Sequence, residues 1–286
     1  MGCTTGAKVL RPDREYILFK NRDFTRESLE DRISLTDKAF GALGLETWDG
    51  NDPERDRLSG FSIGFNAHLA CCDSNVRTVS GGDNYDKLVQ AVVENCTTIK
   101  QAVDCVQTLV RDRLFCWANM IVATKQGVAA LEVRDHHVEV ERNPVCAARA
   151  NHHVRLGATP DDDDPVTTFT RFQSAHDGLK AAGNLNDVFH LLRSHDPDAQ
   201  HSICNHATYY DLLRSRQSRA GDRGFYNTVY SYLVHWNEGE TTLYVLQGHP
   251  CDGIPYTKLP IRFDQTNQIN DLSRYPSKFV GKQAVV

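Results

Sequence analysis

The chain has 286 residues, of which 40% are hydrophobic and 24% are charged, and its formal net charge at pH 7 is −5. This composition is typical of a globular protein with a sizeable core, and it lacks the basic excess that marks nucleic-acid-binding proteins. No apolar run approaches the roughly 18 residues that a membrane helix needs. The first residues lead straight into polar ones, so we expect no secretory signal peptide.

Nine cysteines are spread along the chain, and none of them form a C-x-x-C pair. Without a secretory signal, this pattern predicts a cytoplasmic protein with reduced, mostly buried thiols and no zinc framework. The pairs His136-His137 and His152-His153 do not change this expectation, because adjacent strand residues point to opposite faces and chelate poorly. We therefore expect no metal and no cofactor. The sequence leaves the oligomeric state open, a homo-oligomer included.

The N-terminal segment is predicted to form a hairpin, with strands over residues 4–10 and 15–24 and a turn at Pro12. In an antiparallel hairpin the end of the second strand lies beside the start of the first. The sequence therefore places Arg22 and Asp23 close to Cys3.

Cys3 is the residue on which the functional hypothesis depends. If the mature protein begins at Cys3, this residue carries a thiol and an α-amine whose ordinary pKa is about 7.7–8.0. The amine can then accept the thiol proton, so that one residue supplies both nucleophile and base. Gly2 has no Cβ and allows close approach to the bond that must break, and the thiol could attack the Gly2 carbonyl and release Met1-Gly2.

The rest of the chain is predicted to form blocks of strands and helices. Residues 25–58 are charged and irregular, and we interpret them as a wall of the substrate pocket. A second hairpin is predicted over residues 59–66 and 68–76. Apolar spacing predicts two helices around 88–93 and 99–110, with Thr97 as N-cap between them. Further strands are expected at 118–124, 128–134, 138–141 and 146–151.

Two more helices and three strands complete the predicted order. The helix over 168–182 is expected to bury Phe169, Phe172, Ala175 and Leu179, and a shorter helix follows at 186–194. The strands are predicted at 227–236, 241–247 and 256–262, before a polar tail over residues 264–286. Because the helices cluster instead of alternating with strands, the pattern favours an α+β fold with mostly antiparallel sheets, formed by residues 1–286 as a single domain.

Several stretches together resemble the cysteine N-terminal nucleophile (Ntn) hydrolases, in particular the branch of isopenicillin N acyltransferase. Penicillin V acylases and bile salt hydrolases are more distant members. The start, Gly2-Cys3-Thr4-Thr5 followed by Asn21-Arg22-Asp23, is similar to that family, as is the turn at residues 64–70, where His68 replaces the commoner Gly. Later landmarks occur in the same order: Ser74-Asn75, Glu132, Ala150-Asn151-His152, Ser202-Ile203-Cys204-Asn205-His206, Arg223-Gly224 and Gly248-His249-Pro250-Cys251.

The resemblance implies an αββα sandwich and processing that exposes the cysteine. It implies that Cys3 is the nucleophile, that Asp23 holds the α-amino group with Arg22 beside it, and that Asn151 and Asn75 form the oxyanion hole. Arg223 matches a charged residue near the nucleophile. Asn donors stabilise an oxyanion without titrating, and a cation at Arg22 or Arg223 would lower the pKa of the thiol. The short leader Met1-Gly2 departs from the long propeptide of the fungal enzyme, so one further cut after Gly2 is expected.

Three hypotheses follow. The first is an enzyme that cleaves a linear amide, or an acyl thioester, through an acyl-Cys3 intermediate, as an amidohydrolase or an N-acyltransferase of the thioester-to-amine type. Its partner would be a small-molecule amide or acyl-thioester substrate, with neither nucleic acid nor membrane involved. The second is a catalytically silent binding protein on the same fold. The third is an enzyme that uses an internal thiol such as Cys72 with a nearby His.

Overall fold

The computed structural model of the protein describes residues 2–24, 29–36, 42–49, 60–143, 145–157, 167–194, 203–205, 227–261 and 263. Within this part of the chain lie four α-helices and two antiparallel sheets, so the predicted α+β class with mainly antiparallel sheets is confirmed. The six-stranded sheet has the order β10 (Cys146–Arg149), β1 (Gly2–Arg11), β2 (Glu15–Phe24), β11 (Asn227–Asn237), β12 (Glu240–Gln247) and β13 (Thr257–Ile261).

The second sheet has seven strands and follows chain order. They are β3 (Leu29–Leu35), β4 (Leu43–Asp49), β5 (Ile63–Phe65), β6 (Leu69–Arg77), β7 (Trp117–Thr124), β8 (Gly127–Arg134) and β9 (His137–Asn143). The helices are α1 (Asp86–Asn95), α2 (Ile99–Asp112), α3 (Thr167–Ala181) and α4 (Leu185–Leu192). Every pair of neighbouring strands in these sheets is antiparallel, both in the hairpins and where distant strands meet, as β1 with β10 and β2 with β11.

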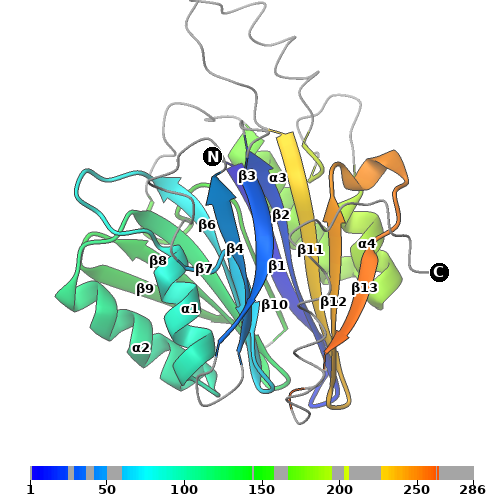
Figure 1. Ribbon diagram of the computed structural model, residues 1–286, viewed down its shortest axis with the longest axis horizontal. Helices are drawn as coiled ribbons and strands as arrows, with labels where there is room; N and C mark the ends of the chain where they lie inside the picture. Colours follow the sequence, from blue (N-terminus) through cyan, green and yellow to red (C-terminus); the bar gives the residue numbers. More distant parts are fainter. Residues whose placement is uncertain are drawn as a thin grey trace, which may run out of the picture.

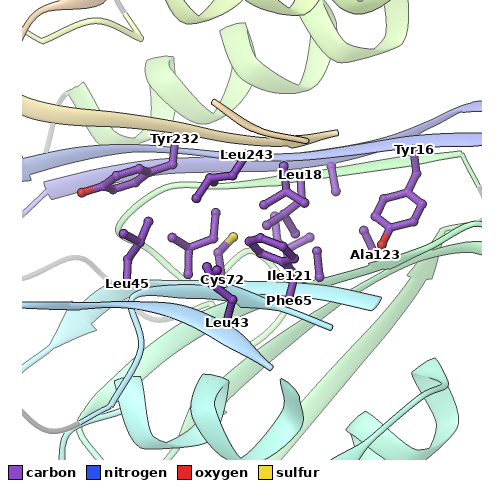
Figure 2. Close-up of a cluster of buried hydrophobic side chains, with 14 of the residues drawn as sticks. Tyr16, Leu18, Leu43, Leu45, Phe65, Cys72, Ile121, Ala123, Tyr232 and Leu243 are labelled. Carbon is purple, nitrogen blue, oxygen red and sulfur yellow. The ribbon is translucent and has the colours of Figure 1, made fainter. Parts of the chain in front are cut away.

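The two sheets face each other, and a helix pair covers the outer face of each (Figure 1). One buried cluster joins α1 and α2 to the seven-stranded sheet, and another joins α3 and α4 to the six-stranded sheet. A third cluster fills the space between the sheets, with Leu18 and Tyr232 from one sheet against Phe65, Cys72 and Ile121 from the other (Figure 2). Both faces of the central strands are therefore buried.

The N-terminal hairpin has the predicted register, because Cys3 pairs with Arg22 and Gly2 pairs with Asp23. Directly paired residues point to the same face of a sheet. Val9 and its partner Tyr16 belong to the core between the sheets, so Cys3 and Arg22, an even number of residues away, also face that space. Asp23 faces the opposite side, towards α3 and α4.

Two predictions about the elements were wrong. Residues 25–58 were predicted to be irregular because they are highly charged. They contain β3 and β4, which lie at one edge of the seven-stranded sheet. Residues 25–28, 37–41 and 50–59 of that stretch lie outside the described residues, as does the tail at 264–286. The N-cap of α2 is Thr98 and not Thr97, because the Thr98 side chain accepts the hydrogen bond from Gln101 N.

The buried face of α3 also differs from the prediction. Phe169 is 48% exposed, whereas Arg171 is buried together with Thr168, Ala175 and Leu179. These four residues follow helical spacing, so the stripe is rotated from the one that hydrophobicity alone suggested. The rotation brings a guanidinium group to the N-terminal strand.

No helix in the described part of the chain is long and apolar enough to cross a membrane.

Candidate active site

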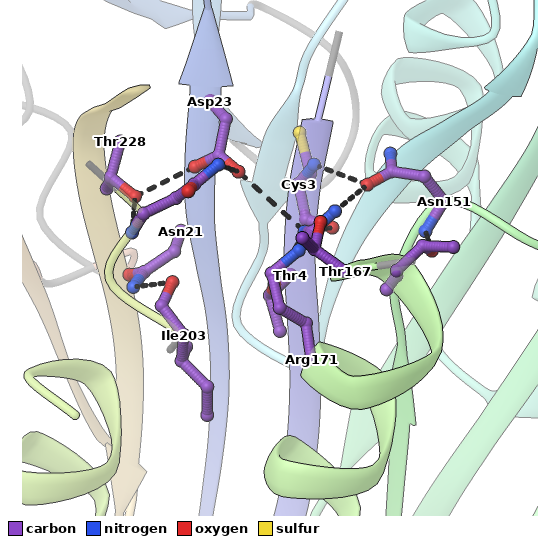
Figure 3. Close-up of polar contacts among 12 residues, drawn as sticks. Cys3, Thr4, Asn21, Asp23, Asn151, Thr167, Arg171, Ile203 and Thr228 are labelled. Atoms are coloured by element: carbon purple, nitrogen blue, oxygen red, sulfur yellow. Dashed lines mark hydrogen bonds and ion pairs between the residues drawn. The ribbon is translucent and has the colours of Figure 1, made fainter. Parts of the chain in front are cut away.

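Cys3 lies near the start of β1 and is 2% exposed. The Gly2–Cys3 peptide bond is intact in this structure, so Cys3 N is an amide. Its N–H donates a hydrogen bond to Asn151 Oδ1 at 3.0 Å (Figure 3). The residue is therefore anchored by a group 148 positions away in the sequence, directly after β10.

Arg171 on α3 holds the same region from the helix side. Its Nη1 donates to Cys3 O at 3.1 Å and to Thr4 Oγ1 at 3.0 Å, and its Nη2 donates to Asn151 Oδ1 at 2.9 Å. The planar guanidinium suits such a fork of donors, which a flexible ammonium group would not reproduce. Cys3 and Asn151 are thus fixed relative to one another by a single buried side chain.

Asp23 completes this buried cluster. One carboxylate oxygen accepts from Thr228 Oγ1 at 2.8 Å, and the other accepts from Asn205 Nδ2 at 3.3 Å and lies 3.7 Å from Arg171 Nη1. Asp23 and Arg171 are both almost inaccessible to solvent, and a buried carboxylate of this kind needs such partners to stay ionised. Asp23 is therefore held beside the start of β1 by partners from three other segments.

Asn151 and Asn75 are adjacent, as the sequence predicted. Asn151 Nδ2 donates to Asn75 O at 2.7 Å, while Asn151 Oδ1 accepts from Cys3 and Arg171. The backbone N–H of Asn151 donates to Thr168 Oγ1 at 2.8 Å, so α3 also positions this residue. With the peptide bond to Gly2 intact, the Asn151 amide orients Cys3 N.

Arg22 and Lys20 place two positive charges between the sheets. Arg22 forms an ion pair with Asp31, which also accepts from Tyr232. Lys20 Nζ donates to Asp73 Oδ1 at 2.7 Å and to Ser62 O at 3.0 Å. Each cation comes from β2 and each carboxylate comes from the opposite sheet, so these two buried pairs join the sheets at the end where Cys3 lies.

The pKa of the Cys3 thiol is raised above its ordinary value, mainly because the residue is buried. Lys20 and Arg22 lower this pKa and Asp23 raises it, but the loss of solvation outweighs the cations. Arg22 lowers the pKa of the thiol, as predicted, but burial raises it by more, which the sequence did not reveal. The thiol is neutral at pH 7 in this state, so a reaction at Sγ needs a base.

The structure brings together five of the six predicted site residues: Cys3, Arg22, Asp23, Asn75 and Asn151. Arg223 lies outside the described residues. Sequence reasoning missed Arg171, Lys20 and Thr228. Nothing in the helical periodicity signalled Arg171, whereas Lys20 could have been noticed as a second cation two positions from Arg22 on the same predicted strand.

The histidines and the other cysteines form no alternative centre in the described part of the chain. His152 Nδ1 lies 3.0 Å from Thr168 Oγ1, whereas His153 Nε2 lies 3.3 Å from Ala118 O. No group of three or more metal-ligating side chains occurs among the described residues. All nine cysteines are free thiols and six are buried, which confirms the prediction of mostly buried thiols.

No model of a known protein family matches the chain, and no curated protein matches it significantly.

Proposed function

We propose that this protein is a cysteine N-terminal nucleophile hydrolase or acyltransferase, which acts on a linear amide or an acyl thioester through an acyl-Cys3 intermediate. One observation carries the proposal. Cys3 lies at the start of β1 within a buried polar cluster in which Asn151 accepts its N–H, Arg171 donates to its carbonyl, and the Asp23 carboxylate lies 3.7 Å from Arg171. The cluster therefore fixes the backbone on both sides of the Cys3 side chain.

The arrangement of layers supports the same proposal. Two antiparallel sheets lie between two helix pairs, which is the order that an αββα Ntn-hydrolase sandwich requires. The sequence motifs that resemble the isopenicillin N acyltransferase branch are compatible with these positions, since Asn151 accepts the Cys3 N–H and donates to the Asn75 carbonyl. Fold alone does not define an activity, so the argument depends on the residues around Cys3.

Processing would come first. The Cys3 thiol attacks the Gly2 carbonyl, the C–N bond of the peptide breaks as the nitrogen gains a proton, and a thioester links Gly2 to Sγ. Water then hydrolyses the thioester and leaves a free Cys3 with an α-amine. Asn151 Oδ1 already accepts from this nitrogen, and the nearby Asp23 carboxylate favours its charged form.

Turnover would use the freed amine as the base. The amine takes the thiol proton, Sγ attacks the substrate carbonyl, and the leaving amine or thiol departs with a proton. Water then releases the acid, or an acceptor amine takes the acyl group. Because the raised pKa of the buried thiol makes it neutral at pH 7, this proton transfer is essential to the mechanism. Asn75 and Asn151 are the proposed oxyanion donors after processing.

The test is to trap the acyl-enzyme. A panel of p-nitrophenyl esters and acyl thioesters of increasing chain length is mixed with the purified protein, and the adduct is located by peptide mass spectrometry. We expect one acyl group on Cys3, none in Cys3→Ala, and normal labelling in Cys72→Ala. Undiminished acylation or amidase activity in Cys3→Ala would contradict the proposal.

The two alternatives make different predictions in the same experiment. A silent binding protein would retain Gly2 and form no adduct with any ester. An enzyme that used Cys72 would be labelled there, although Cys72 is fully buried in the core between the sheets and its Sγ lies 3.9 Å from Phe19 O. The burial of Cys72 makes it the weaker candidate.

A further inference from the structure

An open cavity lies away from the candidate active site, on the helix-facing side of the six-stranded sheet. It has a volume of about 600 Å³ and is lined by residues of α4, β12, β13 and the segment just before β13. Tyr244 and Lys258 are paired across β12 and β13 and face this cavity, whereas their neighbours Leu243 and Leu259 point into the core between the sheets. The cavity is therefore on the opposite face of the sheet from the Cys3 side chain.

Three aromatic rings form the apolar wall of this cavity. The Phe189 ring lies edge-on to Tyr244 at 5.1 Å and tilted to Tyr256 at 5.0 Å. The hydroxyl of Tyr256 lies 2.7 Å from Ser231 Oγ, which holds that ring in place. All three rings are half-buried, so each keeps part of its surface open. A preformed apolar wall of this kind suits a planar aromatic ligand, which can stack on it or meet it edge-on.

The charged side chains at the cavity are both basic. Arg193 and Lys258 contribute to the lining beside His190, and none of the described lining residues is acidic. The Arg193 guanidinium lies 5.9 Å from the centre of the Tyr256 ring, and its Nε is buried without a hydrogen-bond partner among the described residues. A buried donor of this kind is normally satisfied. An anionic group in the cavity would supply the acceptor.

We propose that this cavity binds a planar aromatic organic anion. The ring lies against Phe189, Tyr244 and Tyr256, and the carboxylate, sulfonate or phosphate group lies against Arg193 and Lys258. The site is separate from Cys3, and the proposal does not depend on the acyl-transfer chemistry.

The experiment uses the full-length protein and two matched fluorescent probes. The anionic probe is 1-anilinonaphthalene-8-sulfonate, and the neutral one is N-phenyl-1-naphthylamine, which has the same rings without the sulfonate. The test variant is Arg193→Gln/Lys258→Gln. The control is Arg111→Gln/Lys100→Gln, which removes the same charge from exposed positions on α2, in the other helical layer. The four positions are partly or fully exposed, so both variants should fold.

We expect saturable binding of one sulfonate probe per chain, with affinity about tenfold weaker in the Arg193/Lys258 variant and unchanged in the control. The neutral probe should bind more weakly than the sulfonate to the wild type and should be insensitive to both variants. The absence of saturable binding would overturn the proposal. So would equal binding of both probes, or sulfonate binding that the Arg193/Lys258 variant does not weaken.

Discussion

At the scale of single residues, the site is defined by one buried guanidinium. Arg171 contacts Cys3, Thr4 and Asn151 and lies beside Asp23, so it connects Cys3 to the Asp23 carboxylate and to the Asn151 amide. None of these contacts is local in sequence. The geometry at Cys3 therefore depends on a helix that begins more than 160 residues later.

Two substitutions of Arg171 distinguish the effect of its positive charge from the effect of its hydrogen-bonding geometry. Arg171→Lys keeps a cation but loses the fork of donors, so we expect acylation of Cys3 to slow by about 100-fold. Arg171→Met also removes the buried cation that lies 3.7 Å from Asp23 and should cost about 3–5 kcal/mol of unfolding free energy. Stopped-flow acylation and urea unfolding measure the two effects. Arg111→Lys, on the exposed side of α2, is the control, and acylation of Arg171→Lys within twofold of wild type would contradict this role.

His152 makes a prediction about acid stability. Burial, with a further contribution from Arg149, lowers the pKa of His152 to about 4 in the folded protein, against about 6.5 in the unfolded chain. Because the folded pKa is lowered, the unfolded state binds the proton first as the pH falls. Stability is then complete above about pH 6.5 and is lost between pH 6.5 and pH 4.

We expect this histidine to account for about 2 kcal/mol of the loss in unfolding free energy between pH 7 and pH 5. Urea unfolding of the wild type and of His152→Gln at both pH values checks this, since the variant should lose less stability on acidification even if it is less stable at pH 7. Equal losses in the two proteins would show that His152 is not responsible.

At the scale of elements, α3 and β1 must approach closely for Arg171 to reach Cys3. Gly6 on β1 allows this approach, because a Cβ there would lie 2.7 Å from Leu179 on α3 and 2.7 Å from the Phe19 ring. Leu179 lies on the same buried stripe of α3 as Arg171. The helix is thus positioned by packing at one end and by hydrogen bonds at the other.

Gly6→Ala should therefore affect both stability and the site. We expect a loss of about 1–3 kcal/mol of unfolding free energy from overpacking, together with slower acylation of Cys3 as α3 moves away. The matched control is Gly183→Ala, whose added Cβ would meet only Asp187 Oδ2 at 3.6 Å, an ordinary contact. A stable Gly6→Ala with wild-type acylation would contradict this account of the α3 position.

The elements also show what the sequence could and could not predict. The hairpin of β1 and β2 and the pairing of Cys3 with Arg22 followed from alternation and from the turn at Pro12. β3 and β4 were missed because their charged side chains, Asp31 and Glu46 among them, are buried and hydrogen-bonded instead of exposed. The face of α3 was misjudged because Arg171 is buried by partners on other elements, which helical periodicity does not reveal.

At the scale of the whole molecule, the two sheets are joined by charges as well as by apolar packing. Lys20 with Asp73 and Arg22 with Asp31 cross between the sheets at the end near Cys3, and the apolar core fills the remaining interface. The order of helix and strand blocks predicted the α+β class. The same order could not predict which end of the interface would be polar, because that depends on strands far apart in the chain.

The central claim is that Cys3 becomes an N-terminal nucleophile, and the intact mass of the purified protein tests it most directly. Wild type and Cys3→Ala are expressed in parallel. The account predicts that the wild-type chain begins at Cys3, with Gly2 removed, and that Cys3→Ala retains Gly2 because it lacks the thiol that attacks the Gly2 carbonyl. A wild-type protein that retains Gly2, or a Cys3→Ala variant that loses it equally, would contradict the account.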